Sequence, residues 1–233
     1  MNNSSNIDFI EYLQNSAYID LKKTIMNDYN LDLQGWKSDN FDLIFTNILN
    51  NSTSNSFQEP LIICEIGTWK GLTATTMANI IKPIQNNFKI ICIDTWQGSP
   101  DYLIDIVNNN NINDLIYSHK RIVNHPYIYY TFINNICYLK LYNNVIPLPM
   151  SSLEASNVLE YYNVNFHIIF IDCYYDYNSI KNNLTYYWKL LKNNGYMFGD
   201  YYNIDYVKNV IDEFSNINNI NLTINENFWI LKK

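Results

Sequence analysis

The feature that most constrains the fold is a series of short apolar runs, each followed by a longer amphipathic stretch. From residue 61 onward the runs read LIICEI, KIICID, VIPLP, HIIFID and GYMFGD. Strands that alternate with helices in this way predict a doubly wound, mostly parallel, Rossmann-like α/β sheet. Two more strand-like runs in the tail INLTINENFWILKK predict an antiparallel pair at one edge of that sheet.

The chain of 233 residues shows no linker rich in Pro, Gly or Ser, and 48% of its residues are hydrophobic. We therefore expect one domain with a sizeable core. Residues 1–57 alternate helical patterns with polar breaks, which predicts an N-terminal helical cap in the same domain as residues 58–233. Ser38 or Asp39 can cap a helix that begins near Phe41.

The charge of the chain argues against a nucleic-acid partner. The formal net charge is −7, the pI is about 4.8, and no cluster of Lys and Arg is present. No apolar run is long enough to cross a bilayer, and the first residues lack the pattern of a signal peptide. We expect a cytoplasmic protein without membrane contact, whose four cysteines are reduced thiols.

The first apolar run leads into the sequence EIGTWKG, and the second ends in an acid. Glu65 ends the first predicted strand, Gly67 and Gly71 follow it, and Asp94 ends the second. Glycines permit a sharp bend and the close approach of a ligand, and an acid at the next strand end can accept hydrogen bonds from ribose hydroxyls. This combination predicts a pocket for a cofactor that contains a nucleoside.

The glycine spacing favours S-adenosylmethionine over NAD. A dinucleotide fingerprint requires Gly-x-Gly-x-x-Gly, and Glu65 stands at the first of those glycine positions, where it would oppose a pyrophosphate. An acid and a helix start suit the ammonium and the carboxylate of an amino-acid tail. An NAD-dependent oxidoreductase on a similar sheet is the alternative that this spacing disfavours.

Ligands of parallel sheets bind beyond the carboxyl ends of the strands. Five segments should therefore converge on one crevice: 65–71, 94–97, 150–152, 172–175 and 200–202.

Several motifs occur together in order: LQGWKSDNFDLIF, EIGTWKG, IDTWQGSPD, PMSSLEAS, and the long stretch from IIFIDCYYDYNS to GYMFGDYY. From about Leu33 to the C-terminus, the chain resembles class I S-adenosylmethionine-dependent methyltransferases. The similar branch includes bacterial sugar and macrolide O-methyltransferases and cephalosporin-hydroxylase-like proteins.

The resemblance implies which residues contact the cofactor. It places Glu65, Gly67 and Trp69 at the methionine half, Asp94 at the ribose and residues 150–152 at the adenine. The full expected set is Glu65, Gly67, Thr68, Trp69, Gly71, Asp94, Thr95, Trp96, Met150, Ser151, Ser152 and Asp172.

The resemblance also implies a reaction centre at Asp172 and Asp200. In many relatives such acids hold a divalent metal that binds the acceptor hydroxyl, so Mg²⁺ at Asp172 and Asp200 is expected by likeness. Two positions depart from the family pattern: Tyr175 stands where a histidine base is common, and Tyr201 stands where a second acid or amide often follows. The expected catalytic residues are Asp172, Tyr175 and Asp200, with His119, His125 and Asp176 as further candidate bases.

These observations predict an S-adenosylmethionine-dependent O-methyltransferase that acts on a small polar acceptor, with a sugar or nucleotide sugar as the best match by resemblance. The insertion at 96–142 and the N-terminal helices would form a lid over the acceptor. The chain could also form a homo-oligomer. The alternative is a catalytically degenerate protein that binds the cofactor as a regulatory or scaffold subunit, since Tyr175 and Tyr201 interrupt the expected catalytic pattern.

Overall fold

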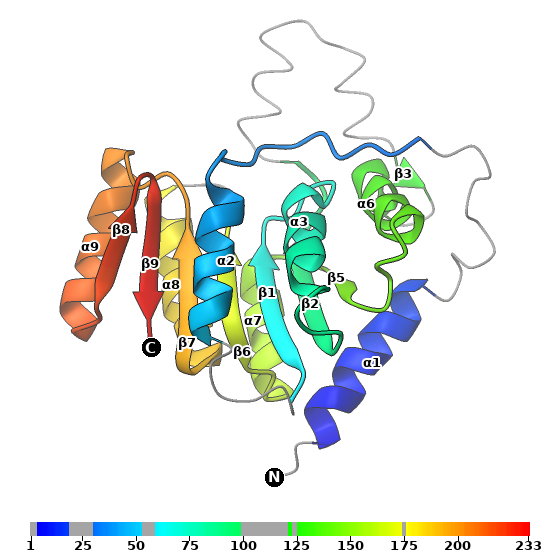
Figure 1. The fold of residues 1–233 in the computed structure, drawn as a ribbon, viewed down its shortest axis with the longest axis horizontal. Coiled ribbons are helices and arrows are strands. Elements are labelled where there is room, and N and C mark those ends of the chain that lie inside the picture. The colour runs from blue at the N-terminus through cyan, green and yellow to red at the C-terminus, as the bar shows by residue number, and fades with distance from the viewer. Residues whose placement is uncertain (1–3, 19–29, 53–58, 99–120, 123–124, 174–175) are drawn as a thin grey trace, which may run out of the picture.

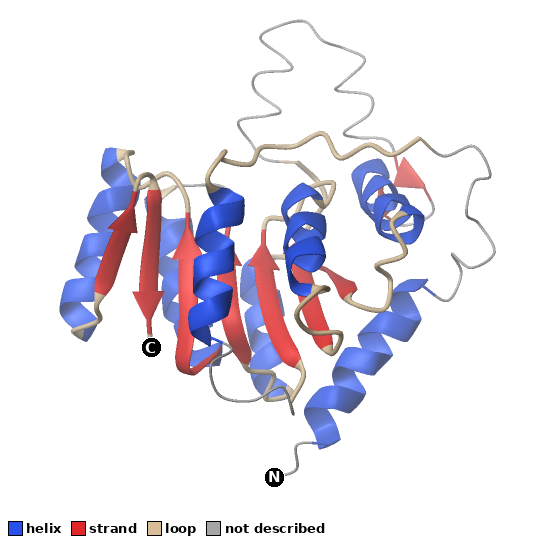
Figure 2. Ribbon diagram, in the orientation of Figure 1, coloured by secondary structure: helices blue, strands red, loops and turns tan. Residues whose placement is uncertain are grey.

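The computed structural model describes residues 4–18, 30–52, 59–98, 121–122, 125–173 and 176–233. These residues form a seven-stranded sheet with helices on both faces (Figures 1 and 2). The strands lie in the order β5-β2-β1-β6-β7-β9-β8. Their bounds are β1 (Leu61–Ile66), β2 (Phe88–Asp94), β5 (Val145–Pro149), β6 (Phe166–Ile171), β7 (Leu191–Gly199), β8 (Leu222–Asn225) and β9 (Phe228–Lys232). A separate two-stranded ribbon consists of β3 (Arg121–Ile122) and β4 (His125–Pro126).

The pairing of the strands confirms the predicted fold class. β1 lies at the centre and pairs in parallel with β2 and β6, while β5 and β7 extend the parallel sheet on either side. β9 runs antiparallel to β7, and β8 runs antiparallel to β9, as expected for the C-terminal edge pair. The carboxyl ends of the five parallel strands therefore share one edge of the sheet.

The helices form two layers around this sheet. One face carries α2, α3 and α6, and the other carries α7, α8 and α9 (Figure 1). Their bounds are α2 (Phe41–Ser52), α3 (Leu72–Ile81), α6 (Tyr127–Tyr138), α7 (Ser152–Tyr161), α8 (Tyr177–Leu190) and α9 (Asp205–Asn218). The apolar faces of these helices bury the Ile-rich strands from both sides, which supplies most of the driving force for folding.

Helix α6 corrects the expectation that the whole insertion at 96–142 forms a lid. Its side chains Phe132, Ile133 and Ile136 are fully buried against the sheet layer. The spacing of these residues by three and four positions places them on one face of the helix. The part of the insertion at 127–138 therefore belongs to the core.

Helix α1 (Ser4–Tyr18) covers the edge of the sheet at β5. The hydroxyl of Tyr18 donates to the carbonyl of Val145 at 2.6 Å, and Lys89 Nζ on β2 donates to Gln14 at 2.6 Å. Covering an edge strand in this way prevents it from pairing with another chain. The predicted boundary at residue 57 stays a prediction, although α2 shares its core cluster with the sheet.

The cysteines and the helix lengths agree with the sequence analysis. Cys64 and Cys92 are buried in β1 and β2, and all four cysteines are free thiols. None of the helices in the described ranges combines the length and the apolar character needed to cross a bilayer.

His167 at the amino end of β6 makes the fold sensitive to acid. Its Nδ1 accepts a hydrogen bond from the backbone N–H of Ile62 at 3.0 Å. Burial, reinforced by the nearby ammonium of Lys192, lowers the pKa of His167 from 6.5 to about 4. Because the folded state disfavours protonation, this contribution to stability is present above pH 6.5 and is lost as the pH falls toward 4.

We expect the wild-type protein to lose on the order of 2–3 kcal/mol of unfolding free energy through His167 between pH 7 and pH 4. His167→Gln removes the titrating group, so its stability should decline less over this range. Urea unfolding of both proteins at the two pH values measures the difference. Identical losses in the two proteins would show that His167 does not carry this effect.

Candidate functional site

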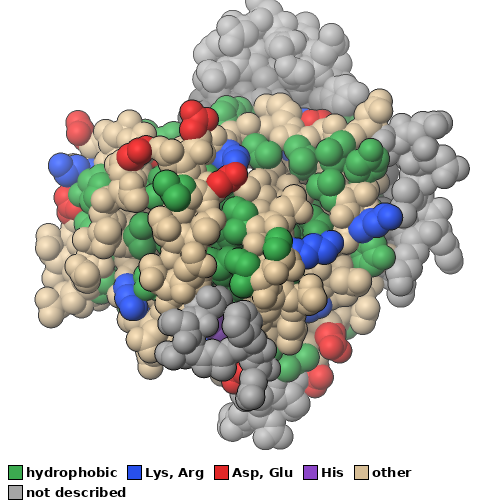
Figure 3. Space-filling model, in the orientation of Figure 1, with side chains coloured by type: hydrophobic (Ala, Val, Ile, Leu, Met, Phe, Trp, Pro, Cys, Tyr) green, Lys and Arg blue, Asp and Glu red, His purple; other side chains and the backbone are tan. Residues whose placement is uncertain are grey.

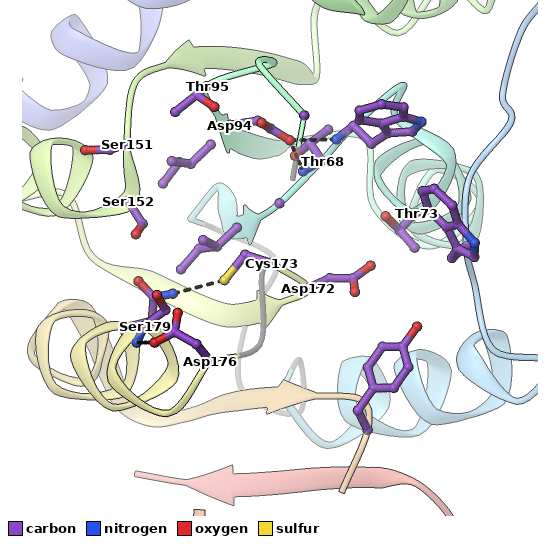
Figure 4. Close-up of a pocket in the computed structure, with 18 of the residues that line it drawn as sticks. Thr68, Thr73, Asp94, Thr95, Ser151, Ser152, Asp172, Cys173, Asp176 and Ser179 are labelled. Atoms are coloured by element: carbon purple, nitrogen blue, oxygen red, sulfur yellow. Dashed lines mark hydrogen bonds between the residues drawn. The ribbon is translucent and has the colours of Figure 1, made fainter. Parts of the chain in front are cut away.

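A cavity of about 940 Å³ opens beyond the carboxyl ends of the parallel strands (Figure 4). The turn after β1 contributes Gly67, Thr68 and Trp69 to its wall, and the end of β2 contributes Asp94 and Thr95. The start of α7 contributes residues 150–152, and Asp172 lines the cavity from the end of β6. Each of the five segments expected to converge therefore contributes to this cavity, the last of them through Tyr201.

Gly67 permits the turn after β1 to lie directly against the end of β6. Its φ angle is +88°, and a Cβ at this position would lie 2.0 Å from the carbonyl oxygen of Asp172. The backbone N–H of Asp172 donates in turn to the carbonyl of Ile66 at 2.8 Å. No side chain fits between these two backbones, so the glycine is required at this position.

The carboxylate of Asp94 holds the glycine turn in shape. One oxygen accepts the backbone N–H groups of Thr68 at 2.9 Å and Trp69 at 2.8 Å (Figure 4). The other oxygen accepts the backbone N–H of Trp96 at 2.7 Å. Burial raises the pKa of Asp94, and the backbone N–H bonds oppose that rise by stabilising the anion. The predicted ribose ligand is thus also the anchor of the cofactor turn.

Trp69 adopts a left-handed conformation with a φ angle of +51°, which is costly for a bulky residue. Its N–H is bonded to Asp94, and its carbonyl accepts the indole N–H of Trp96 at 2.6 Å. Trp96 itself is fully buried and does not line the cavity. The resemblance placed Trp96 in contact with the cofactor, but in the structure it supports the turn from the protein core.

Glu65 does not reach the cavity. Its side chain is fully buried, and its carboxyl group accepts hydrogen bonds from the hydroxyls of Thr68, at 2.9 Å, and Thr73. Burial raises the pKa of Glu65 to about 8, so the group is mostly protonated at pH 7. A neutral group enclosed in this way does not supply the ammonium contact that the sequence suggested, whereas Thr68 and Thr73 both line the cavity.

Gly71 also lies outside the cavity wall. It precedes α3 with a φ angle of +90°, and a Cβ there would approach the ring of Phe132 to 3.0 Å. The close packing of α3 against α6, together with the left-handed backbone, accounts for this glycine.

A capping box starts α7 beside the cavity. Ser151 accepts the backbone N–H of Glu154, and the Glu154 side chain accepts the backbone N–H of Ser151. This arrangement fixes residues 150–152, which the resemblance places at the adenine, in the cavity wall.

A smaller cavity of about 300 Å³ adjoins the large one near the ends of β6 and β7. Asp172 and Tyr201 line both cavities, and Asp200 lines the smaller one. Asp200 is only 6% exposed; its carboxylate accepts the hydroxyl of Ser38 and, at 2.6 Å, the backbone N–H of Tyr201. Burial, together with the charges of Asp172 and Asp200, raises the pKa of Tyr201, so its phenol stays protonated.

Residues 31–39, here called the strap, run across the strand ends from the side of α6 to α2 (Figure 1). At one end Asp32 exchanges two hydrogen bonds with the buried amide of Asn135, at 3.0 and 2.6 Å, and pairs with Lys70 at 2.8 Å. At the other end Ser38 binds Asp200. The strap is therefore a fixed part of the site.

The sequence analysis missed part of the cavity wall. Gly35 and Trp36 of the strap line both cavities, and Tyr177 and Tyr206 line the large one. The strap belongs to the motif LQGWKSDNFDLIF, which was the one available signal, although no role could be assigned to its residues.

The other candidate bases have different outcomes. Asp176 caps α8, where its carboxylate accepts the backbone N–H groups of Asn178 and Ser179 at 3.0 and 3.1 Å. Tyr175, His119 and the side chain of His125 lie outside the described residues. A catalytic role for them stays a prediction.

The described side chains fit a resident Mg²⁺ poorly. Both oxygens of Asp200 are already hydrogen-bonded, and Tyr201 supplies a protonated phenol where a second carboxylate would complete the set. Within the described ranges no three Asp, Glu, His or Cys side chains form a group that could hold a metal. The described residues therefore do not supply the donor set that the resemblance implied for Mg²⁺ at Asp172 and Asp200, and no catalytic step below depends on this ion.

The large cavity suits S-adenosylmethionine. Its volume lies in the usual range for cofactor sites, and the turn after β1 contributes Gly67, Thr68 and Trp69 to its wall. A doubly wound sheet with this turn, tied to an acid at the next strand end, defines the class of Rossmann-like S-adenosylmethionine-dependent methyltransferases. The sequence model of the methyltransferase domain family matches residues 64–202, and the chain belongs to this family. The protein is accordingly an S-adenosylmethionine-dependent methyltransferase.

Solved structures with the same fold are similar over nearly the whole chain. The O-methyltransferase NovP has a TM-score of 0.64 and 14% identity, and covers 98% of this chain and 99% of its own. The calicheamicin methyltransferase CalS11 has a TM-score of 0.56 and 16% identity, with coverage of 93% and 91%. TomG from Streptomyces achromogenes, solved with S-adenosylmethionine, has a TM-score of 0.52 and 12% identity, with coverage of 99% and 95%. Among the curated proteins no sequence matches the chain.

On the face shown in Figure 3, the Lys and Arg side chains lie in small separate groups among acidic and polar ones. This distribution is consistent with the expected lack of a nucleic-acid partner, which stays a prediction.

The buried carboxyl group of Glu65 should make the protein less stable as the pH rises. Its folded pKa of about 8 lies above its ordinary value of 4.5, so unfolding releases a proton between these limits. We expect the wild type to lose about 2–3 kcal/mol through this group between pH 6 and pH 9. Glu65→Gln is neutral throughout and should lack that loss in urea unfolding.

Glu160→Gln on the exposed side of α7 is the matched control. It should follow the wild-type pH profile. A Glu65→Gln profile parallel to that of the wild type would contradict the protonated state of Glu65.

Proposed function

We propose that the protein transfers a methyl group to a hydroxyl of a small polar acceptor, a sugar or nucleotide sugar. The observation that carries this proposal is the position of Asp172, which lines both the large and the small cavity. In this proposal the large cavity is the donor chamber and the smaller cavity, called the small chamber below, holds the acceptor. A carboxylate between the two can take the proton of a hydroxyl. The description of CalS11 as a TDP-rhamnose 3′-O-methyltransferase supports a sugar-like acceptor.

The bound cofactor would supply a methyl group on a positively charged sulfur, where the carbon is open to attack. The protein must mainly align the acceptor oxygen with that carbon, and alignment can contribute about 7–11 kcal/mol. The turn at Gly67 and Thr68 fixes the donor side. In this arrangement Asp172 would accept the proton of the acceptor hydroxyl as its oxygen takes the methyl group from the sulfonium, and S-adenosylhomocysteine would be released.

Asp94→Asn should weaken the binding of S-adenosylhomocysteine by about 10- to 100-fold, because an amide cannot accept all three backbone N–H groups or serve the ribose as an anion does. Isothermal titration calorimetry measures the change. Unaltered affinity would refute the placement of the cofactor at this turn.

A second ligand separates the two roles of Asp94. The wild type should bind the 2′-deoxyribose analogue of S-adenosylhomocysteine more weakly than S-adenosylhomocysteine itself. If Asp94 contacts the ribose, the difference in affinity between the two ligands should be smaller in Asp94→Asn than in the wild type. An equal discrimination in both proteins would leave Asp94 as an anchor of the turn only.

Turnover distinguishes this proposal from the alternative of a degenerate binding protein. A methyltransferase should form S-adenosylhomocysteine with at least one member of a panel of sugars, nucleotide sugars and catechols. Cofactor binding without turnover on such a panel would favour the regulatory or scaffold role. The cytoplasmic location and a homo-oligomeric state remain predictions from the sequence.

We infer from the donor set that transfer proceeds without a resident metal. Methyl transfer should keep its rate within twofold in excess EDTA, measured as formation of S-adenosylhomocysteine. A rate that is lost in EDTA and restored by Mg²⁺ would contradict this inference. Tyr201→Asp adds the missing carboxylate, so calorimetry should detect stronger Mg²⁺ binding in that variant than in the wild type.

A further inference from the structure

Trp36, in the middle of the strap, carries an unusually exposed aromatic ring beside the reaction centre. The residue is 60% exposed, although Trp is among the most buried residue types on average. Its ring lies 6.2 Å from that of Trp69 at an interplanar angle of 50°, and it lines both cavities. An apolar ring held open at a cavity wall offers a flat surface to a bound molecule.

The two residues that precede Trp36 in the strap, Gln34 and Gly35, both lie near Trp69. Gly35 of the strap faces the start of α3. A Cβ added to Gly35 would lie 3.5 Å from the side chain of Leu72 and 3.8 Å from that of Trp69. The indole N–H of Trp69 reaches the side chain of Gln34 at 3.4 Å. The strap thus places Trp36 beside Trp69, where its ring lines both the large and the small cavity.

The small chamber offers hydrogen-bond partners to hydroxyl groups. Asp172 and Asp200 provide carboxylate oxygens, and Ser38 and Tyr201 provide hydroxyls. The hydroxyl of Ser38 donates a hydrogen bond to Asp200, and a hydroxyl of a bound molecule could take its place and make the same bond. A chamber with one apolar wall and several oxygen atoms opposite suits a ring that carries adjacent hydroxyl groups.

The charges of the chamber disfavour a phosphate at this position. Lys37 is the one basic residue among the described lining residues of the two cavities, and its Nζ is paired with Asp42 at 2.5 Å. The remaining charged groups of the small chamber are carboxylates. An anion would therefore meet like charge without a free cation to compensate it.

We propose that the small chamber binds an uncharged sugar ring, with one face of the ring against Trp36 and a pair of adjacent hydroxyls on Asp172 and Asp200. The hydroxyl on Asp172 is the one methylated. Its neighbour replaces the hydroxyl of Ser38 on Asp200. This inference rests on the proposed function and assigns its acceptor subsite.

Saturation-transfer NMR on protein loaded with S-adenosylhomocysteine tests the subsite. The probes are methyl α-D-mannopyranoside and methyl β-D-glucopyranoside, with mannose 6-phosphate and catechol for comparison. We expect at least one neutral glycoside to receive saturation from the protein more strongly than the phosphate or catechol does. Preferential contact with the phosphate or catechol, or no contact with either glycoside, would overturn the proposal.

Variants of Trp36 locate the contact. Trp36→Ala should abolish the signal of the glycoside and raise its Kd at least tenfold, while Trp36→Phe should retain most of the binding. Leu43→Ala on α2, which removes an equally exposed side chain outside the cavities, is the matched control and should change neither. Glycoside binding that Trp36→Ala leaves unchanged would also overturn the proposal.

Ser38→Ala tests the exchange of hydroxyl groups at Asp200. Because the competing serine hydroxyl is gone, the glycoside should bind about 2- to 10-fold more tightly. Weaker binding would show that Ser38 only supports the strap and would refute the exchange.

Binding of S-adenosylhomocysteine, measured by calorimetry, separates this inference from the proposed function. Ser38→Ala and Leu43→Ala, whose side chains lie outside the large cavity, should keep their affinity within twofold of the wild type. If the wild type fails to bind S-adenosylhomocysteine, the proposed function fails as well. If it binds and the glycoside results fail, only the acceptor subsite is refuted.

Discussion

The capture of two backbone N–H groups by one oxygen of Asp94 is the interaction on which the site depends. The turn after β1 includes Trp69 in a left-handed conformation that an isolated chain would adopt only at a cost of about 1–3 kcal/mol. Asp94 and the indole of Trp96 together satisfy both polar backbone groups of that residue. The same bonds stabilise a buried carboxylate that would otherwise favour its neutral form. One residue thus shapes the cavity wall and supplies its charge.

The sheet could be predicted from the sequence because its strands are continuous Ile-rich runs and parallel connections leave few topologies open. The meeting of the glycine turn and Asp94 at one cavity was also predictable, since both follow the ends of neighbouring parallel strands, whereas the ribose contact of Asp94 stays a prediction. The core position of helix α6 was missed because the helical spacing of Phe132 and Ile136 lies within a long polar and aromatic stretch.

Other parts of the site depend on contacts that a sequence does not display. The position of Glu65 at a strand end is visible, but its enclosure by Thr68 and Thr73 depends on how α3 packs over the turn. The contact of Ser38 with Asp200 joins residues 162 positions apart. The strap has no periodic pattern from which its place above the strand ends could be read.

Tyr201, which stands where the family often has a second acid or an amide, changes how the charge of its neighbour Asp200 is compensated. A buried carboxylate must be compensated by a cation or by hydrogen bonds. Here the hydroxyl of Ser38 and the N–H of Tyr201 provide hydrogen bonds, and the tyrosine adds no second negative charge at position 201. The small cavity therefore contains the carboxylates of Asp172 and Asp200 but no third one at position 201, and the proposal of transfer without a resident metal rests on this difference.

The direct backbone contact between Gly67 and Asp172 has an evolutionary consequence. The turn after β1 and Asp172, the proposed general base, cannot move independently of each other, since no side chain separates their backbones. The strap, by contrast, meets this unit mainly through side chains that can be exchanged one at a time. If the strap forms the acceptor subsite proposed above, substitutions in it would change which acceptor is methylated and leave the methyl-transfer step itself intact.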